Sequence, residues 1–165
     1  MIGSLPPRAQ FAAVSQSKAS IIGLDSMTHW LETDLSEFSA ILCCTQLLFL
    51  TREELSMLSM RIGESWISTA QTLLGKHLRL KGIIVKAGRF GAAFVTRNHI
   101  VERPAVSVVD ILDPSGAGDA LAGALLGACS QAERFDDEFI SGPALRAGLD
   151  SAAAAISSFG ISALI

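Results

Sequence analysis

The sequence predicts an α/β fold, with a mostly parallel sheet and helices on both of its faces. Short runs that are apolar throughout alternate with longer stretches in which apolar residues recur at helical spacing. Strands without polar alternation are typical of parallel sheets, which are covered on both faces. The chain has 165 residues, of which half are hydrophobic and only 18% are charged. This length and composition predict a single, well-covered α/β domain over residues 1–165.

The first half of the chain alternates three apolar runs with amphipathic stretches. Pro6 and Pro7 begin a turn or a helix near the N-terminus. Thr51 is followed three residues later by Glu54, which is typical of a helix start. Residues 65–78 carry apolar residues on one helical face, so they are predicted as a helix. The three apolar runs are predicted as strands over Ile21–Leu24, Ile41–Cys43 and Leu47–Leu50.

The second half continues the same alternation. Gly82–Lys86 is predicted as a buried strand, with Ala92–Val95 as its neighbour across a glycine-containing turn. Residues 119–131 and 143–158 are predicted as helices rich in small residues. Ligands of parallel sheets bind beyond the carboxyl ends of the strands. Functional residues are therefore expected at four places: Asp25, Thr51, Lys86–Gly91 and Asp113–Asp119.

Composition excludes several classes of function. The net charge is −3 and no run of basic residues is present, so we expect no nucleic-acid partner. The apolar run over residues 120–129 is shorter than the roughly 20 residues that span a bilayer, and the N-terminus has no signal-peptide pattern, so no membrane partner is expected. The three cysteines include no CxxC spacing, which favours reduced thiols and a cytoplasmic location.

The segment Asp113-Pro114-Ser115-Gly116-Ala117-Gly118-Asp119 is the most informative part of the chain. Its small residues open directly into a predicted helix, where backbone N–H groups and the helix dipole favour an anion. Asp119 in the first turn could then accept a proton from an attacking hydroxyl. The alternative interpretation is a glycine-rich turn with an aspartate stabilised by the helix dipole.

This segment, with Gly123-Ala124-Leu125-Leu126 after it, resembles the second signature of the ribokinase-like (PfkB) carbohydrate kinases. Four further segments are similar to this family in the same order along the chain. They are Leu24–Trp30 (a strand-end segment), Thr51–Glu54 (the Asn-x-x-Glu motif), Lys86–Gly91 (the nucleotide-phosphate loop) and Ser151–Gly160 (a segment bordering the adenine pocket and a cation loop).

The resemblance implies a three-layer α/β/α fold and an ATP-dependent kinase that uses Mg²⁺. By this resemblance Asp119 is the catalytic base, and Gly116, Ala117 and Gly118 form the anion hole for the transferred phosphoryl group. Glu54 would organise Mg²⁺ through water, which fits an ion that keeps much of its hydration. The family places a monovalent cation, often potassium, near Asp113, and the residues implied to bind ATP are Lys86, Gly88, Gly91, Ser115 and Gly160.

The chain departs from the family pattern at two positions and in length. Thr51 stands where the family usually has Asn, and Lys86 stands where it often has Thr. Lys86 could contact a phosphate or could extend its ammonium to solvent from a strand end. The chain resembles the C-terminal, nucleotide-binding half of these kinases. We therefore expect the N-terminal half, which binds the acceptor and forms a lid, to be absent.

Two functions remain open at this point. The first is transfer of a phosphoryl group to a hydroxyl of a sugar, nucleoside or related polyol, with the isolated chain itself inactive. The second is a non-catalytic nucleotide-binding fragment or degenerate kinase module, which the missing half and Thr51 favour. An apolar surface left by the absent half could also support a homodimer. A dinucleotide-binding interpretation is weaker, because Gly88-Arg89-Phe90-Gly91 is not a G-x-G-x-x-G sequence.

Overall fold

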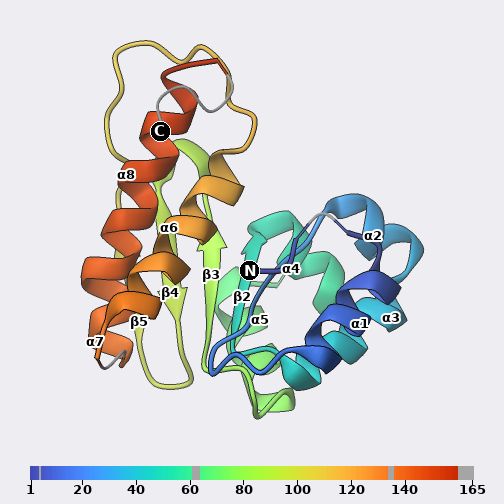
Figure 1. Ribbon diagram of the computed structural model, residues 1–165. Helices are drawn as coiled ribbons and strands as arrows, with labels where there is room; N and C mark the ends of the chain where they lie inside the picture. The colour runs from blue at the N-terminus through green and yellow to red at the C-terminus, as the bar shows by residue number, and fades with distance from the viewer. Residues whose placement is uncertain (4, 61–63, 134–135, 160–165) are drawn as a thin grey trace. The chain divides into compact units, whose positions relative to one another are not determined.

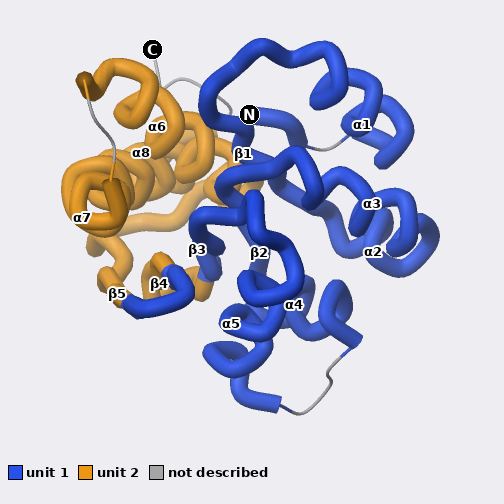
Figure 2. The backbone as a smooth tube through the Cα atoms, turned by 90° about the horizontal axis from the view of Figure 1, so that it is seen from below, with its two compact units in different colours: residues 1–86, 95–100 blue, residues 87–94, 101–165 orange. Residues whose placement is uncertain are grey.

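The computed structural model describes residues 1–3, 5–60, 64–133 and 136–159. The chain divides into two compact units, shown in different colours in Figure 2. The first unit comprises Met1–Lys86 and Val95–Ile100, and the second comprises Ala87–Phe94 and Val101–Ile165. The strands of the sheet follow one another in the order β1-β2-β3-β4-β5. The predicted α/β class is confirmed.

The first unit contains three parallel strands, β1 (Gly23–Asp25), β2 (Leu47–Thr51) and β3 (Gly82–Lys86). Leu24, Leu48 and Ile83 lie beside one another in the register and are fully buried. Strands that are buried on both faces need no polar alternation, which is why their sequences are continuous apolar runs. The three strands predicted at these positions are confirmed.

The rest of the first unit is mostly helical. Its helices are α1 (Pro7–Gln16), α2 (Thr28–Thr33), α3 (Leu35–Ile41), η1 (Leu42–Cys44), α4 (Arg52–Ser59) and α5 (Trp66–Lys76). Of these, α4 and α5 contact the strands of the unit. Pro at the first position of α1 fits a helix start, because its missing N–H has no acceptor there in any helix. The helix predicted after Thr51 is confirmed as α4, and the helix predicted over residues 65–78 is confirmed as α5.

The strand predicted over Ile41–Cys43 is wrong. Ile41 ends α3, and Leu42–Cys44 form the short 3-10 helix η1. Phe38, Ile41 and Leu42 are fully buried at helical spacing, so they form the inner face of an amphipathic helix. An apolar run of four residues does not distinguish this face from a buried strand.

The second unit contains most of strands β4 and β5 and a group of helices. Strand β4 (Ala92–Val95) confirms the prediction, whereas β5 (Ile100–Arg103) was not expected, because its mostly exposed residues lack an apolar run. The remaining elements are η2 (Gly88–Phe90), α6 (Ala117–Gln131), α7 (Asp137–Phe139), η3 (Ile140–Ala144) and α8 (Leu145–Ile156).

Helices α6 and α8 lie side by side, as Figure 1 shows. At their contact a Cβ on Gly148 would lie 2.8 Å from the backbone oxygen of Leu121, so an added side chain would force the helices to shift. The helix predicted over residues 143–158 is confirmed in its main part as α8. It is preceded by a π-helical turn, η3, which contains Pro143. Within the described residues, none of the helices is both long enough and apolar enough to span a bilayer.

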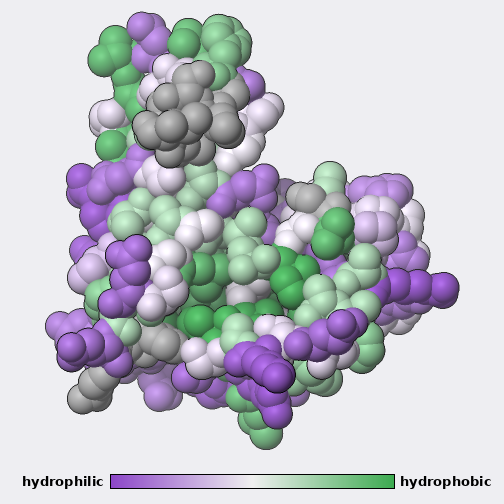
Figure 3. Space-filling model, viewed as in Figure 1, coloured by the Kyte–Doolittle hydropathy of each residue, from purple (hydrophilic) through white to green (hydrophobic). Residues whose placement is uncertain are grey.

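The segment that connects β5 to α6 carries apolar side chains on its surface. Val109 and Ile111 on this segment are exposed. Figure 3 shows that hydrophobic residues also occur among the polar ones on the visible surface. The backbone N–H of Leu112 donates to the oxygen of Ile156, which ties this segment to the end of α8.

Candidate functional site

The predicted site residues fall into two groups, one in each unit. In the first unit, residues at the carboxyl ends of β1, β2 and β3 come together: Asp25, Thr51 with Glu54, and Lys86. In the second unit, the group comprises Gly88 and Gly91 in the turn before β4, and the residues from Asp113 to Asp119 before and in α6. Gly160, which was expected to bind the nucleotide, lies outside the described residues.

Thr51 and Glu54 form a reciprocal capping box at the start of α4. The Thr51 hydroxyl accepts the Glu54 backbone N–H at 3.1 Å, and Glu54 Oε2 accepts the Thr51 backbone N–H at 2.8 Å. Glu54 is buried, with 6% of its surface exposed. One carboxylate oxygen of Glu54 is thus engaged by the helix, which leaves Oε1 for any contact with hydrated Mg²⁺.

Lys86 does not extend freely into solvent. Its Nζ lies 2.8 Å from Oδ1 and 3.0 Å from Oδ2 of Asp25, so the last residue of β3 is joined to the last residue of β1. Only 16% of the Lys86 side chain and 7% of the Asp25 side chain are exposed. Asp25 Oδ1 also accepts the backbone N–H of Ser26. The sequence predicts that both residues lie at strand ends, but no local pattern in it predicts their ion pair.

The turn between β3 and β4 depends on its two glycines. Gly88 and Gly91 both have positive φ, at 54° and 101°. A Cβ at Gly91 would overlap the backbone of Arg103 and Pro104, so a side chain at this position would clash as well as strain the backbone. The backbone N–H of Ala87 donates to the oxygen of Gly91 and closes the turn. The result is a tight turn in which Gly88 is exposed and Gly91 is buried against the backbone of residues 103–105. The Gly88 end of the turn suits close approach to a phosphate.

Helix α6 begins with the Gly-Ala-Gly segment. Its N-cap is Gly116, which has a φ of 76° and provides no side-chain cap. The first turn contains Ala117, Gly118 and Asp119, so no bulky side chain covers the N–H groups at this end. Asp119 is exposed, and its carboxylate makes no hydrogen bond or ion pair with the residues that the structure describes. This geometry does not favour a capping role for Asp119.

Asp113 is held just before α6. Its Oδ1 accepts the backbone N–H of Ser115 at 2.9 Å. The backbone and hydroxyl hydrogen bonds from Ser115 lower the pKa of the Asp113 carboxyl, so Asp113 stays ionised at neutral pH. A carboxylate and nearby backbone oxygens are a donor set that monovalent cations accept. The Ser115 side chain itself is exposed.

The donor set for Mg²⁺ is sparse. The described part of the chain holds no group of three or more His, Cys, Asp or Glu residues that could bind a metal ion. Mg²⁺ in nucleotide sites is usually bound by one or two carboxylates, water and the phosphates themselves, rather than by a cage of protein ligands. The residues present therefore fit a magnesium ion that is carried by a nucleotide.

Comparison with known proteins gives the family and the fold. The model of the pfkB family carbohydrate kinases matches residues 12–164. No curated protein matched the sequence.

Solved structures of similar fold include a fructokinase from Vibrio cholerae O395 in a fructose, ADP and calcium ion bound form. It has a TM-score of 0.79 and 22% identity, with 95% of this chain and 52% of that chain covered. A nucleoside kinase from Methanocaldococcus jannaschii has a TM-score of 0.75 and 19% identity, with coverages of 96% and 49%.

An aminoimidazole riboside kinase from Salmonella enterica, complexed with aminoimidazole riboside and an ATP analog, has a TM-score of 0.73 and 22% identity. The match covers 88% of this chain and 49% of that kinase. The chain thus spans about half the length of these kinases. At these identities the likeness shows the fold, whereas the family model covers nearly the whole chain. The chain therefore belongs to the pfkB family of carbohydrate kinases.

Proposed function

We propose that the chain is the ATP-binding and catalytic-base part of a kinase that phosphorylates a hydroxyl of a sugar or nucleoside. The observation that carries this proposal is the start of α6, where Gly116, Ala117 and Gly118 place no bulky side chain at the helix N-terminus beside the exposed Asp119. The carboxylate has no structural task among the described residues, so it remains available to accept a proton. The kinases of similar fold act on sugars or nucleosides, which supports the class of acceptor.

In the proposed reaction the acceptor hydroxyl attacks the γ-phosphorus of ATP in line. The hydroxyl proton passes to Asp119, the new O–P bond forms, and ADP leaves with the electrons of the broken bond. Backbone N–H groups of Ala117 and Gly118 stabilise charge on the transferred phosphoryl group. Mg²⁺ bound with the nucleotide would neutralise phosphate charge, and the resemblance assigns its hydrated side to Glu54. Asp113 is the side-chain candidate for a monovalent cation.

Asp119→Asn tests this mechanism in a longer chain that also contains an acceptor-binding half. We expect kcat to fall by about 10²–10⁴-fold, because Asn keeps the size of Asp but cannot accept the proton. The affinity for MgATP, measured by calorimetry, should stay within about twofold, because the backbone N–H groups are unchanged. Near-normal kcat in the Asn variant would show that Asp119 is structural.

Gly118→Val tests the anion hole in the 165-residue chain itself. A branched side chain in the first turn of α6 should obstruct the N–H groups and weaken MgATP binding by about tenfold or more. Gly123→Ala, in the same helix with open space around its Cβ, is the matched control and should bind MgATP normally. Equal binding by both variants would place the nucleotide elsewhere.

A non-catalytic nucleotide-binding module is the second candidate, and one observation favours it. One oxygen of the Glu54 carboxylate and the Thr51 hydroxyl are occupied by the capping box, where the family usually has an Asn-x-x-Glu motif. For this 165-residue chain we expect MgATP binding with little or no transfer to sugars or nucleosides. Holding the acceptor next to ATP can lower the barrier by about 7–11 kcal/mol, and this chain would lose that gain without an acceptor-binding half. Substantial ADP formation that depends on an added sugar would contradict this expectation.

A further inference from the structure

The ion pair between Asp25 and Lys86 is the feature of the first unit that the proposed reaction does not use. The pair joins the carboxyl ends of β1 and β3 across β2. In the register Asp25 lies beside Phe49 and Lys86 lies beside Thr51. Since side chains alternate between the faces of a sheet, Asp25, Thr51 and Lys86 all belong to the same face.

Stability alone does not explain this pair. Taking a carboxylate and an ammonium out of water costs free energy that their attraction only partly returns, and apolar side chains of similar volume often stabilise a fold as well or better. Both side chains are largely buried at a place in the fold where parallel sheets bind ligands. A charged pair at this edge is therefore better explained by a ligand than by packing.

The donors of Lys86 are not all used. An ammonium group has three N–H donors, and the two oxygens of Asp25 account for two of them. No third acceptor for Nζ occurs among the residues that the structure describes. Asp25 is itself fixed by the backbone N–H of Ser26, so the ammonium is bound to a rigid partner.

We propose that Asp25 is a positioning residue, which holds the Lys86 ammonium at the end of the sheet so that its third N–H donates to a phosphate oxygen. A free lysine side chain loses much rotamer freedom when it binds an anion. Here Asp25 has already restricted it, so the anion meets an ordered donor. This inference rests on the proposed function only in naming the anion as a nucleotide phosphate.

The test compares variants of the 165-residue chain for binding of MgATP and of tripolyphosphate, which has the phosphates without the nucleoside. Lys86→Met should weaken both by about 10-fold to 100-fold, the value of one charge-assisted hydrogen bond. Asp25→Glu keeps the charge but moves the carboxylate by one methylene. It should weaken the binding of both ligands by about threefold to tenfold, because only part of that hydrogen bond is lost. The salt dependence of binding should stay unchanged, because the charges are the same.

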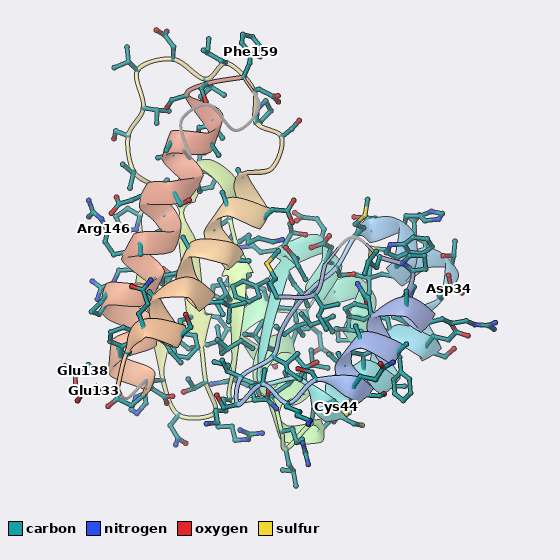
Figure 4. The ribbon with its side chains drawn as sticks, viewed as in Figure 1. Asp34, Cys44, Glu133, Glu138, Arg146 and Phe159 are labelled. Carbon is teal, nitrogen blue, oxygen red and sulfur yellow. The ribbon has the colours of Figure 1, made fainter. Side chains whose placement is uncertain are left out.

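The double variant separates positioning from a merely structural role. If Asp25 acts through Lys86, Asp25→Glu should have no further effect on binding in the Lys86→Met background. Asp150→Asn is the control, because it removes the carboxylate of the exposed Arg146–Asp150 pair on α8, where Arg146 is labelled in Figure 4. It should leave binding unchanged. If Asp25→Glu does not fold, Lys86→Arg displaces the donors from the other side of the pair and should weaken binding to the same degree.

Three outcomes overturn the inference. They are unchanged binding in Lys86→Met, binding in Asp25→Glu equal to that of the wild type with only a lower Tm, and no binding of tripolyphosphate by the wild type. The proposed function fails separately. One outcome would support the anion site but contradict the proposed nucleotide function. In it, the wild type binds tripolyphosphate but not MgATP, and the variants lose tripolyphosphate binding.

Discussion

His77 follows the last residue of α5 and is partly buried. Burial, and then the charge of Lys76, lower the pKa of the His77 imidazole below its ordinary value of 6.5. The unfolded chain therefore binds more protons than the folded chain between that lowered pKa and 6.5. The contribution of His77 to stability should be constant above this window and should fall as the pH drops through it. Melting temperatures between pH 8 and pH 5 should show a loss in the wild type that is smaller in His77→Gln, and parallel curves for the two proteins would contradict the prediction.

Thr51 combines a structural role with a place in the candidate site. Thr51→Ala removes the side-chain half of the capping box and should cost about 0.5–2 kcal/mol of unfolding free energy. Thr51→Asn should stay within about 0.5 kcal/mol of the wild type, because Asn is also a good N-cap. Urea denaturation measures both. Ser65→Ala is the control, since Ser65 is the N-cap of α5 without a side-chain hydrogen bond, and a cost equal to that of Thr51→Ala would argue against the capping box.

At the scale of elements, the close approach of α6 and α8 determines which glycines can be replaced by alanine without a loss of stability. Gly148→Ala would place a Cβ against the backbone of Leu121, and we expect a loss of about 1–3 kcal/mol because two helices must separate. Gly123→Ala and Gly127→Ala lie in α6 with open space around the added Cβ. These two should gain up to about 1 kcal/mol from helix propensity. Denaturation followed by far-UV circular dichroism would show opposite shifts, and equal shifts would disprove the packing argument.

At the scale of the whole molecule, the division into two units raises the question of cooperativity. Both tryptophans, Trp30 and Trp66, belong to the first unit, whereas Gly148 belongs to the second. The chain passes between the units three times, and the residues of β4 and of β5 are each divided between them. We therefore expect a single cooperative transition.

Gly148→Ala offers a direct test of that cooperativity. The midpoint of tryptophan fluorescence should move by the same amount as the midpoint of circular dichroism, although the substitution lies in the other unit. Thr51→Ala, in the first unit, should likewise move both signals together. A change confined to circular dichroism in Gly148→Ala would show that the units unfold independently.

Local signals in the sequence determined much of this protein. The continuous apolar runs at β1, β2 and β3, the hydroxyl-to-glutamate spacing at α4, and the Gly-Ala-Gly start of α6 each carry their own structural information within a few residues. The family resemblance rested on the same short segments, and the family match over residues 12–164 confirms it. Roles within the site, including that of Asp119, remain predictions.

Only the tertiary structure decided the remaining features. Ile41–Cys43 became helical because packing selects between two elements that a short apolar run fits equally well. The residues of strand β5 are mostly exposed, so no apolar pattern in the sequence predicts this strand. The Asp25–Lys86 pair joins residues 61 positions apart, and it exists because β1 and β3 flank β2 in parallel register. That register is a property of the assembled sheet, and no local sequence pattern encodes it.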